Sequence, residues 1–184
     1  YSFYWNTPLN NIFKKLAAEK EQFWASNNRK EKAEKLGYTP EQVYTLASIV
    51  EEETIRDDEK GNIASVYLNR LRIGMEMGAD PTIKFALNDF SIKRILEKHL
   101  NVQSPYNTYR NIGLPPGPIC TPSIVTIDAT LNAPKTDYLF CCAKADFSGY
   151  HNFAATYDQH LKYADEYQQE LNRIAKAKAQ TATK

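Results

Sequence analysis

The spacing of hydrophobic residues predicts that helices make up most of this chain. Apolar side chains recur every three or four residues after Leu9, which predicts a first helix that reaches about Trp24. The charged stretch that follows continues as a second helix or as a linker, and Gly37 ends it.

A helix start at Thr39 carries the clearest local signal. Thr39 and Gln42 match a capping box, in which each side chain bonds the backbone N–H of the other residue. Pro40 occupies the first helical position, where its missing N–H costs nothing. The helix is predicted to run through the segment TLASIVEEET.

Beyond this helix the pattern predicts short helices and a long loop. One helix is expected after the acidic residues 57–59, and one or two shorter helices within residues 82–100. Residues 101–122 hold five of the nine prolines, which excludes a helix or a central strand and predicts an ordered loop. Loops of this length in compact domains are usually functional.

The C-terminal part combines helices with a hairpin. Residues 123–133 carry a short helical pattern. The runs DYLFCCA and YHNFAA are predicted to pair as antiparallel strands joined by KADFSG. A last helix over about Tyr157 to Ala175 precedes a tail, residues 176–184, that is expected to fray. The predicted fold class is therefore α+β: helix-rich, with a small antiparallel sheet.

Composition and charge limit the partners. The chain has 23 basic and 22 acidic residues among 184, so it lacks the basic surplus of nucleic-acid-binding proteins. The three cysteines and three histidines show no metal-ligand spacing, so we expect no metal and no cofactor. No apolar run approaches the ~18 residues that a membrane-spanning helix needs.

The acidic run Glu51, Glu52 and Glu53 offers the best candidates for chemistry. On a helical wheel, Glu52 points away from the apolar stripe and is expected in solvent. Glu51 and Glu53 lie on opposite margins of that stripe, where burial can raise the pKa of a carboxyl group, as a general acid requires. The spacing does not choose between these two, and a solvated acidic helix end is the structural alternative.

Several segments in the same order resemble one protein family. SIVEEET, ASVYLNRL, DPTI, SPYNTYRNIGLPPGPICTPS, LNAPKTDYLF and YHNFAATYDQH together resemble the YceG/MltG-like endolytic murein transglycosylases. The resemblance covers about residues 38–167 and identifies a catalytic domain over residues 38–175. Residues 1–37 resemble the tail of the LysM-like subdomain that precedes this domain in the family.

The resemblance also implies an activity. The family cleaves peptidoglycan glycan strands between N-acetylmuramic acid and N-acetylglucosamine without water, leaving 1,6-anhydro-muramyl ends. It implies Glu51 as the catalytic carboxyl group, first acid and then base, acting at the outer face of the inner membrane. An N-terminal transmembrane helix would anchor the full-length protein, and peptidoglycan synthases are candidate partners. A hydrolytic muramidase and a non-catalytic glycan-binding or divisome scaffold module are the alternatives.

Other polar residues are candidates for substrate binding. Asp80 suits either a helix cap or a sugar contact, and Arg70 suits either an ion pair with a site carboxylate or a structural salt bridge. Aromatic and amide groups in the proline-rich loop suit sugar rings. The full set of expected substrate-binding residues is Asn69, Arg70, Asp80, Thr82, Tyr106, Asn107, Thr108 and His151.

Overall fold

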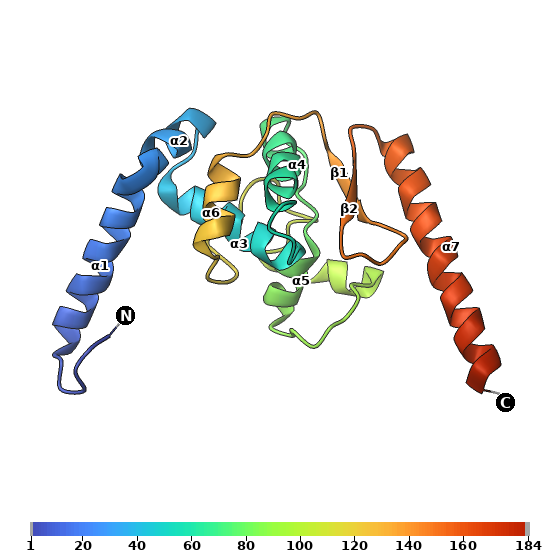
Figure 1. Ribbon diagram of the computed structural model, residues 1–184, viewed down its shortest axis with the longest axis horizontal. Coiled ribbons are helices and arrows are strands. Elements are labelled where there is room, and N and C mark those ends of the chain that lie inside the picture. Colours follow the sequence, from blue (N-terminus) through green and yellow to red (C-terminus); the bar gives the residue numbers. More distant parts are fainter. Residues whose placement is uncertain (1, 183–184) are drawn as a thin grey trace.

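The computed structural model describes residues 2–182, and helices flank a central pair of crossing helices (Figure 1). The elements in chain order are α1 (Leu9–Ala25), the 3-10 helix η1 (Ser26–Asn28), α2 (Arg29–Leu36), α3 (Pro40–Glu53), α4 (Lys60–Arg72), α5 (Asp80–Leu87), the 3-10 helix η2 (Glu97–Asn101), α6 (Ile124–Leu131), β1 (Phe140–Ala143), β2 (His151–Ala154) and α7 (Tyr157–Ala182). The predicted α+β class is confirmed.

The core lies where α3, α4 and α6 pack against one another. One face of α3 packs on α4, on the loop after α4 and on the proline-rich segment after η2, and the opposite face packs on α2 and α6. Helix α3 is therefore buried over most of its length, as its apolar stripe predicts. The buried residues of the first cluster are Leu46, Ile49, Val50, Ile63, Ala64, Tyr67, Met77, Ala79 and Ile119.

The predicted capping box starts α3. The Thr39 side chain accepts a bond from the Gln42 backbone N–H at 3.3 Å, and the Gln42 side chain accepts one from the Thr39 N–H at 2.8 Å. Two N–H groups that the first turn leaves free are thereby satisfied. The helix ends at Glu53, so its last turn carries the acidic run.

The predicted hairpin is present and lies between α4 and α7. Strands β1 and β2 pair antiparallel, with Phe140 opposite Ala154 and Ala143 opposite His151. Helix α7 packs against both strands. It continues to Ala182 and so extends into the tail that was expected to fray; residues 183–184 lie outside the described residues.

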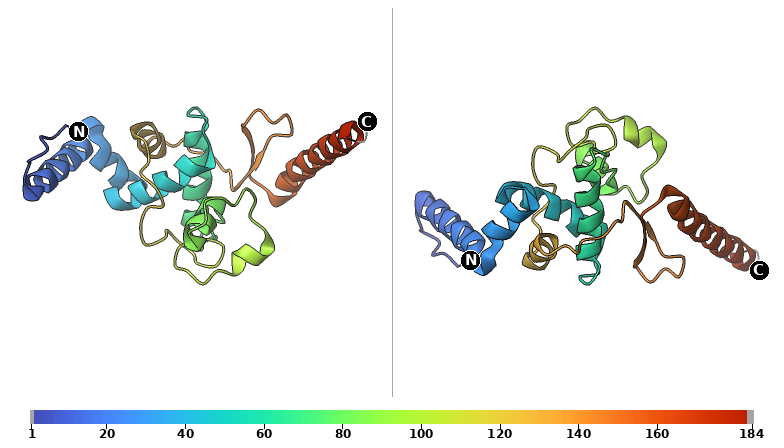
Figure 2. Two further views of the ribbon diagram at one scale, coloured as in Figure 1. Left: turned by 90° about the horizontal axis from the view of Figure 1, so that it is seen from below. Right: turned by 90° about the horizontal axis from the view of Figure 1, so that it is seen from above.

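The helices before and after the centre differ in part from the sequence prediction. Helix α5 starts at Asp80, earlier than expected, and the second short helix of that region is the 3-10 turn η2. At the N-terminal side, Asn27 and Asn28 have positive φ angles of 56°, which bend the chain between α1 and α2. Helices α1 and α7 extend from opposite sides of the molecule (Figure 2).

The proline-rich segment is held by buried side chains. The Asn107 amide group donates to the backbone carbonyls of Leu100 and Val102 at 2.9 Å each. The backbone N–H of Ile119 donates to Ser48 Oγ on α3 at 3.0 Å. These bonds satisfy backbone groups that a loop without regular structure would otherwise leave unpaired. The predicted ordered loop is thus fixed against α3.

Candidate active site

Three adjoining hollows form a trough along the end of α3. The central cavity, about 540 Å³, lies between α4, the hairpin and the start of α5. A side hollow of about 490 Å³ shares Glu53, Ala143 and His151 with it. An outer hollow of about 340 Å³ shares Glu51 with the side hollow. The last turn of α3 therefore presents its carboxyl groups to all three.

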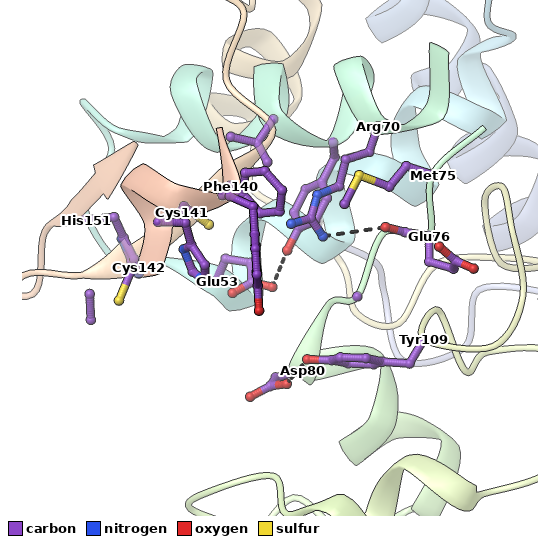
Figure 3. A pocket seen from close by; sticks show the side chains of 16 residues that line it. Glu53, Arg70, Met75, Glu76, Asp80, Tyr109, Phe140, Cys141, Cys142 and His151 are labelled. Atoms are coloured by element: carbon purple, nitrogen blue, oxygen red, sulfur yellow. Dashed lines mark hydrogen bonds between the residues drawn. The ribbon is translucent and has the colours of Figure 1, made fainter. Parts of the chain in front are cut away.

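Glu53 lies in the wall of the central cavity. Its Oε1 accepts a bond of 2.5 Å from the hydroxyl of Tyr67, a buried residue of α4 (Figure 3). Burial raises the pKa of Glu53 to about 7; the Tyr67 bond opposes this rise and the negative charge of Asp80 adds to it. The carboxyl group is thus protonated in a large fraction of molecules near neutral pH.

Glu51 has different surroundings and does not line the central cavity. Its Oε2 accepts bonds from the Ser123 backbone N–H at 3.1 Å, from the Ser123 hydroxyl at 3.0 Å and from the Thr126 hydroxyl. Lys60 Nζ lies 3.5 Å away. Burial acts to raise the pKa of Glu51, but the Thr126 and Ser123 bonds and the Lys60 charge outweigh it and hold the pKa below its ordinary value.

This result corrects the expectation that Glu51 is a carboxyl group with a raised pKa. The start of α6 supplies hydrogen-bond donors that favour its ionised form, and the sequence spacing could not place α6 there. Glu52 is exposed, as predicted. Of the two residues that the helical wheel left open, only Glu53 combines a cavity with a raised pKa.

Arg70 lines the central cavity from α4. Its Nε donates to the Leu139 carbonyl at 2.6 Å, and its Nη1 donates to the Met77 carbonyl at 2.5 Å. The guanidinium also lies over the Phe140 ring, 5.3 Å from the centroid. Arg70 therefore ties the hairpin to the loop after α4 through backbone carbonyls, where a salt bridge was expected. Its positive charge acts to lower the pKa of Glu53.

Asp80 lies across the cavity from Glu53 and is hydrogen-bonded to the side chain of Tyr109. The Tyr109 hydroxyl donates to Asp80 Oδ1 at 2.5 Å, and both residues lie below Glu53 in Figure 3. Asp80 is the first residue of α5, whose cap position is Ala79, so of the two alternatives for Asp80 the helix cap is not the one found. Gly78 makes room here: a Cβ on it would lie 3.2 Å from Arg70 Nη1 and 3.6 Å from the Tyr109 ring.

His151 opens β2 and lines both the central cavity and the side hollow. The buried carboxylate of Glu59 contacts His151 at two atoms, the backbone nitrogen and the ring Nδ1. Glu59 Oε1 accepts from the His151 backbone N–H at 2.7 Å, and Oε2 lies 3.2 Å from the ring Nδ1. The imidazole is therefore fixed in orientation at the junction of two hollows.

The remaining predicted site residues lie outside the central cavity and support its walls. Asn69 donates to the carbonyls of Thr136 and Tyr138, which positions the strand that leads into β1. Thr82 and Thr108 share a buried bond of 2.8 Å, and Asn107 holds its own loop. Tyr106 packs against Phe85 with ring centroids 4.6 Å apart. The expected direct sugar contacts of these residues find no support in this placement.

Most of the cavity lining escaped the sequence-based prediction, and its ring-bearing members include Tyr67, Tyr109, Phe140 and His160. His160 is not among the expected site residues, yet it lines the cavity and stacks on Phe140, with ring centroids 5.3 Å apart. Burial and the nearby Arg70 charge lower its pKa. The aromatic residues surround a polar centre, a composition that suits sugar rings.

The three cysteines are half-buried. Cys141 lies in the cavity wall, and burial, with the Glu53 charge, raises its pKa to about 12. All three cysteines are free. Among residues 2–182, no three His, Cys, Asp or Glu side chains gather as a metal site would require. Within the same residues, no helix is both long and apolar enough to cross a membrane.

Comparisons with known proteins agree with the resemblance seen in the sequence. Residues 1–166 match the model of the YceG-like family. A Bacillus subtilis (strain 168) protein named endolytic murein transglycosylase is 35% identical over 162 residues, which are 88% of this chain and 44% of that protein. A Streptococcus pneumoniae (strain D39) protein with the same name is 34% identical over 109 residues, 57% of this chain and 20% of that protein.

A solved structure supports the fold. The crystal structure of a YceG-like protein from Listeria monocytogenes superposes with a TM-score of 0.74 and 31% identity, over 88% of this chain and 51% of that one. The chain spans less than half the length of the two relatives named above. With nine-tenths of its residues inside the family model and the same fold in a solved member, the chain belongs to the YceG-like family.

Proposed function

We propose that this chain is the catalytic part of an endolytic murein transglycosylase and that Glu53 is its general acid. The observation that carries the proposal is the placement of Glu53: a half-buried carboxyl group in a cavity walled by aromatic rings. The names of the B. subtilis and S. pneumoniae relatives supply the reaction class. We prefer Glu53 to Glu51, which the sequence resemblance implies, because Glu53 lines the central cavity, whereas Glu51 lies outside it and is hydrogen-bonded to Ser123 and Thr126.

The chemistry needs one protonated carboxyl group. Glu53 donates its proton to the oxygen between the N-acetylmuramyl and N-acetylglucosaminyl units as that bond breaks through an oxocarbenium-like state. The C6 hydroxyl of the muramyl unit then attacks the anomeric carbon and closes the 1,6-anhydro ring. Because nucleophile and electrophile belong to one sugar, binding in the correct conformation supplies a large effective molarity.

The shape of the site supports cleavage within a strand. The trough continues past Glu53 in two directions, to Asp80 and Tyr109 on one side and to Glu51 and Lys60 on the other. A polymer can therefore lie across the acid with sugar units on both sides. This arrangement fits an endolytic enzyme better than a pocket closed at one end, which would bind a strand terminus.

Mass analysis of digested sacculi tests the assignment, with Glu53→Gln and Glu51→Gln compared side by side. Glu53→Gln keeps an acceptor for Tyr67 and is expected to lower anhydro-muropeptide release by at least about 10²-fold, since the proton donor is lost. Glu51→Gln separates the two carboxyl groups: it should lose less activity than Glu53→Gln, because Glu51 lies outside the central cavity. Release of anhydro-muropeptides by Glu53→Gln at the wild-type rate would exclude Glu53 as the acid.

A hydrolytic muramidase is the second candidate, and Asp80 is the observation that favours it. Asp80 is a second carboxyl group in the same cavity as Glu53, which is the arrangement that activates water in glycoside hydrolases. The products differ, because hydrolysis adds the mass of water and leaves a reducing end. If sacculi bind without any cleavage that depends on Glu53, the non-catalytic glycan-binding or scaffold alternative is correct.

The proposed substrate also suggests where the full-length protein acts. Peptidoglycan lies outside the cytoplasm, so we place the enzyme at the extracytoplasmic face of the cell membrane. An N-terminal transmembrane anchor outside this chain and an association with peptidoglycan synthases follow from the family resemblance. Membrane fractionation of the full-length protein tests the anchor, and co-purification after cross-linking tests the synthases.

A further inference from the structure

Glu59 and His151 form a pair that the proposed acid does not account for. Glu59 is only 5% exposed, and its carboxylate accepts both the backbone N–H of His151 and the ring Nδ1 contact. Burying a carboxylate costs free energy unless the carboxylate is paired, and His151 is the residue at the cavity edge that pairs with Glu59. The pair joins the start of α4 to the start of β2.

The geometry fixes which ring nitrogen is available. With Nδ1 facing the Glu59 carboxylate, Nδ1 carries the hydrogen and donates it, which leaves the lone pair of a neutral imidazole on Nε2. Nε2 has no protein hydrogen-bond partner among residues 2–182. It is also not one of the fully buried side-chain atoms in this range that lack a partner, so solvent can reach it. It therefore remains open to a ligand at the junction that His151 shares with Glu53.

We propose that His151, oriented by Glu59, is the base of the reaction; this inference rests on the proposed function. Glu53 gives its proton to the leaving glycosidic oxygen as the bond between that oxygen and C1 breaks. As the muramyl O6 bonds to C1, His151 Nε2 takes the O6 proton. The imidazolium then returns one proton to the Glu53 carboxylate. The enzyme gives one proton to the leaving oxygen and takes one from O6, so it returns to its starting state.

With His151 as the base, the reaction is divided between two groups, Glu53 as acid and His151 as base. Glu53 gives a proton and His151 takes one, so neither group has to change role within one step. Glu59 is a positioning residue, because it holds the imidazole in one tautomer and stabilises the imidazolium that forms. An aspartate has the same effect on the histidine in the serine-protease triad.

Imidazole rescue tests the base directly. His151→Ala is expected to lower kcat for anhydro-muropeptide formation by about 10²–10³-fold, and added imidazole should restore it several-fold by filling the space of the missing ring. The matched control is His99→Ala, which removes a half-buried imidazole on η2 that lines none of the three hollows and should respond to imidazole no more than the wild-type chain does. Thermal unfolding verifies that each variant is folded.

Glu59→Gln tests the orientation without removing the ring. Its amide oxygen still accepts the His151 backbone N–H, but its NH₂ group faces Nδ1 and forces the ring hydrogen onto Nε2. We expect kcat to fall by at least about 10²-fold with KM little changed, and no rescue by imidazole, because the ring still fills its place. Glu59→Gln combined with His151→Ala should lose little more than His151→Ala alone.

The outcomes separate this inference from the proposed function. If Glu53→Gln is inactive while folded His151→Ala keeps the wild-type rate, His151 is not the base and the acid assignment stands. If His151→Ala is slow and imidazole does not restore it, while Glu59→Gln retains full activity, the pair is only structural and the inference is wrong. Activity retained by Glu53→Gln would overturn the proposed function first.

Discussion

At the scale of single residues, the site places two glutamates of one helix turn in opposite electrostatic states. Hydrogen bonds from Ser123 and Thr126 favour the charged form of Glu51, and burial beside Tyr67 favours the neutral form of Glu53. The two carboxyl groups are two positions apart in the sequence. Their difference comes from the elements that each one faces, because α3 presents them to different neighbours.

The raised pKa of Glu53 predicts a pH-dependent cost to stability. Between its ordinary value near 4.5 and about 7, the unfolded chain ionises Glu53 while the folded chain keeps it protonated. Folding stability therefore falls as the pH rises through this window, and the full cost remains above it. Glu53→Gln removes the cost and should raise the free energy of unfolding by about 2 kcal/mol at about pH 8, but change it little near pH 4.

Urea unfolding of both proteins at the two pH values measures this difference. Glu52→Gln is the control, because Glu52 is exposed and its substitution should have nearly the same small effect at both pH values. A stability gain of Glu53→Gln that is equal at both pH values would show that Glu53 is not ionised differently in the folded and unfolded states.

At the scale of elements, Ser48 holds the proline-rich segment to α3. Its fully buried hydroxyl accepts the Ile119 N–H at 3.0 Å and donates to the Thr45 carbonyl at 2.7 Å. Ser48→Ala leaves the Ile119 N–H without a partner and should destabilise the fold by about 1–3 kcal/mol. Chemical denaturation measures the loss. Ser91→Ala removes an exposed hydroxyl and should cost less than about 0.5 kcal/mol; an equal loss in both variants would contradict the role of Ser48.

The elements themselves could largely be predicted from the sequence, whereas the site could only in part. The capping box at Thr39 is local, so its pattern indicates both the start and the face of α3. The choice between Glu51 and Glu53 depends on which margin of α3 meets α6. A helical wheel of α3 holds no information on where α6 packs. His160 looked like a packing residue because nothing in its sequence neighbourhood shows that α7 reaches the cavity.

The proline-rich segment shows why polar loop residues mislead. Asn107 and Thr108 suit sugar recognition by residue type, yet the Asn107 amide group bonds the backbone of its own segment and Thr108 Oγ1 accepts the Ala79 N–H before α5. A segment without regular structure must satisfy its buried N–H and carbonyl groups somehow, and short polar side chains are the nearest source. Tyr109, the next residue along, extends into the cavity.

At the scale of the whole molecule, Arg29 joins the N-terminal segment to the domain that carries the trough. Its Nε and Nη2 bond the two carboxylate oxygens of Asp128 on α6 at 2.7 and 2.8 Å, and Arg29 is only 4% exposed. Arg29→Met keeps the apolar stem but leaves Asp128 unpaired, and we expect a loss of about 2–3 kcal/mol. Helices α1 and α2 should then also become more sensitive to proteolysis.

Thermal unfolding and limited proteolysis measure these two effects. Lys30→Met is the control, because the Lys30 pair with Glu21 is exposed and should contribute less than about 1 kcal/mol. If Arg29→Met unfolds at the wild-type temperature, the contact with α6 does not stabilise the arrangement of the N-terminal segment.

The raised pKa of Cys141 bears on how the protein withstands oxidation. Oxidants and disulfides react with thiolates, and a thiol whose pKa is about 12 is ionised in only roughly one molecule in 10⁵ at neutral pH. Cys142 lies next to it, but neighbouring side chains of a strand point to opposite faces, so the two sulfurs are turned apart. The Cys141 thiol beside Glu53 is therefore expected to react slowly with oxidants and with thiol-directed inhibitors.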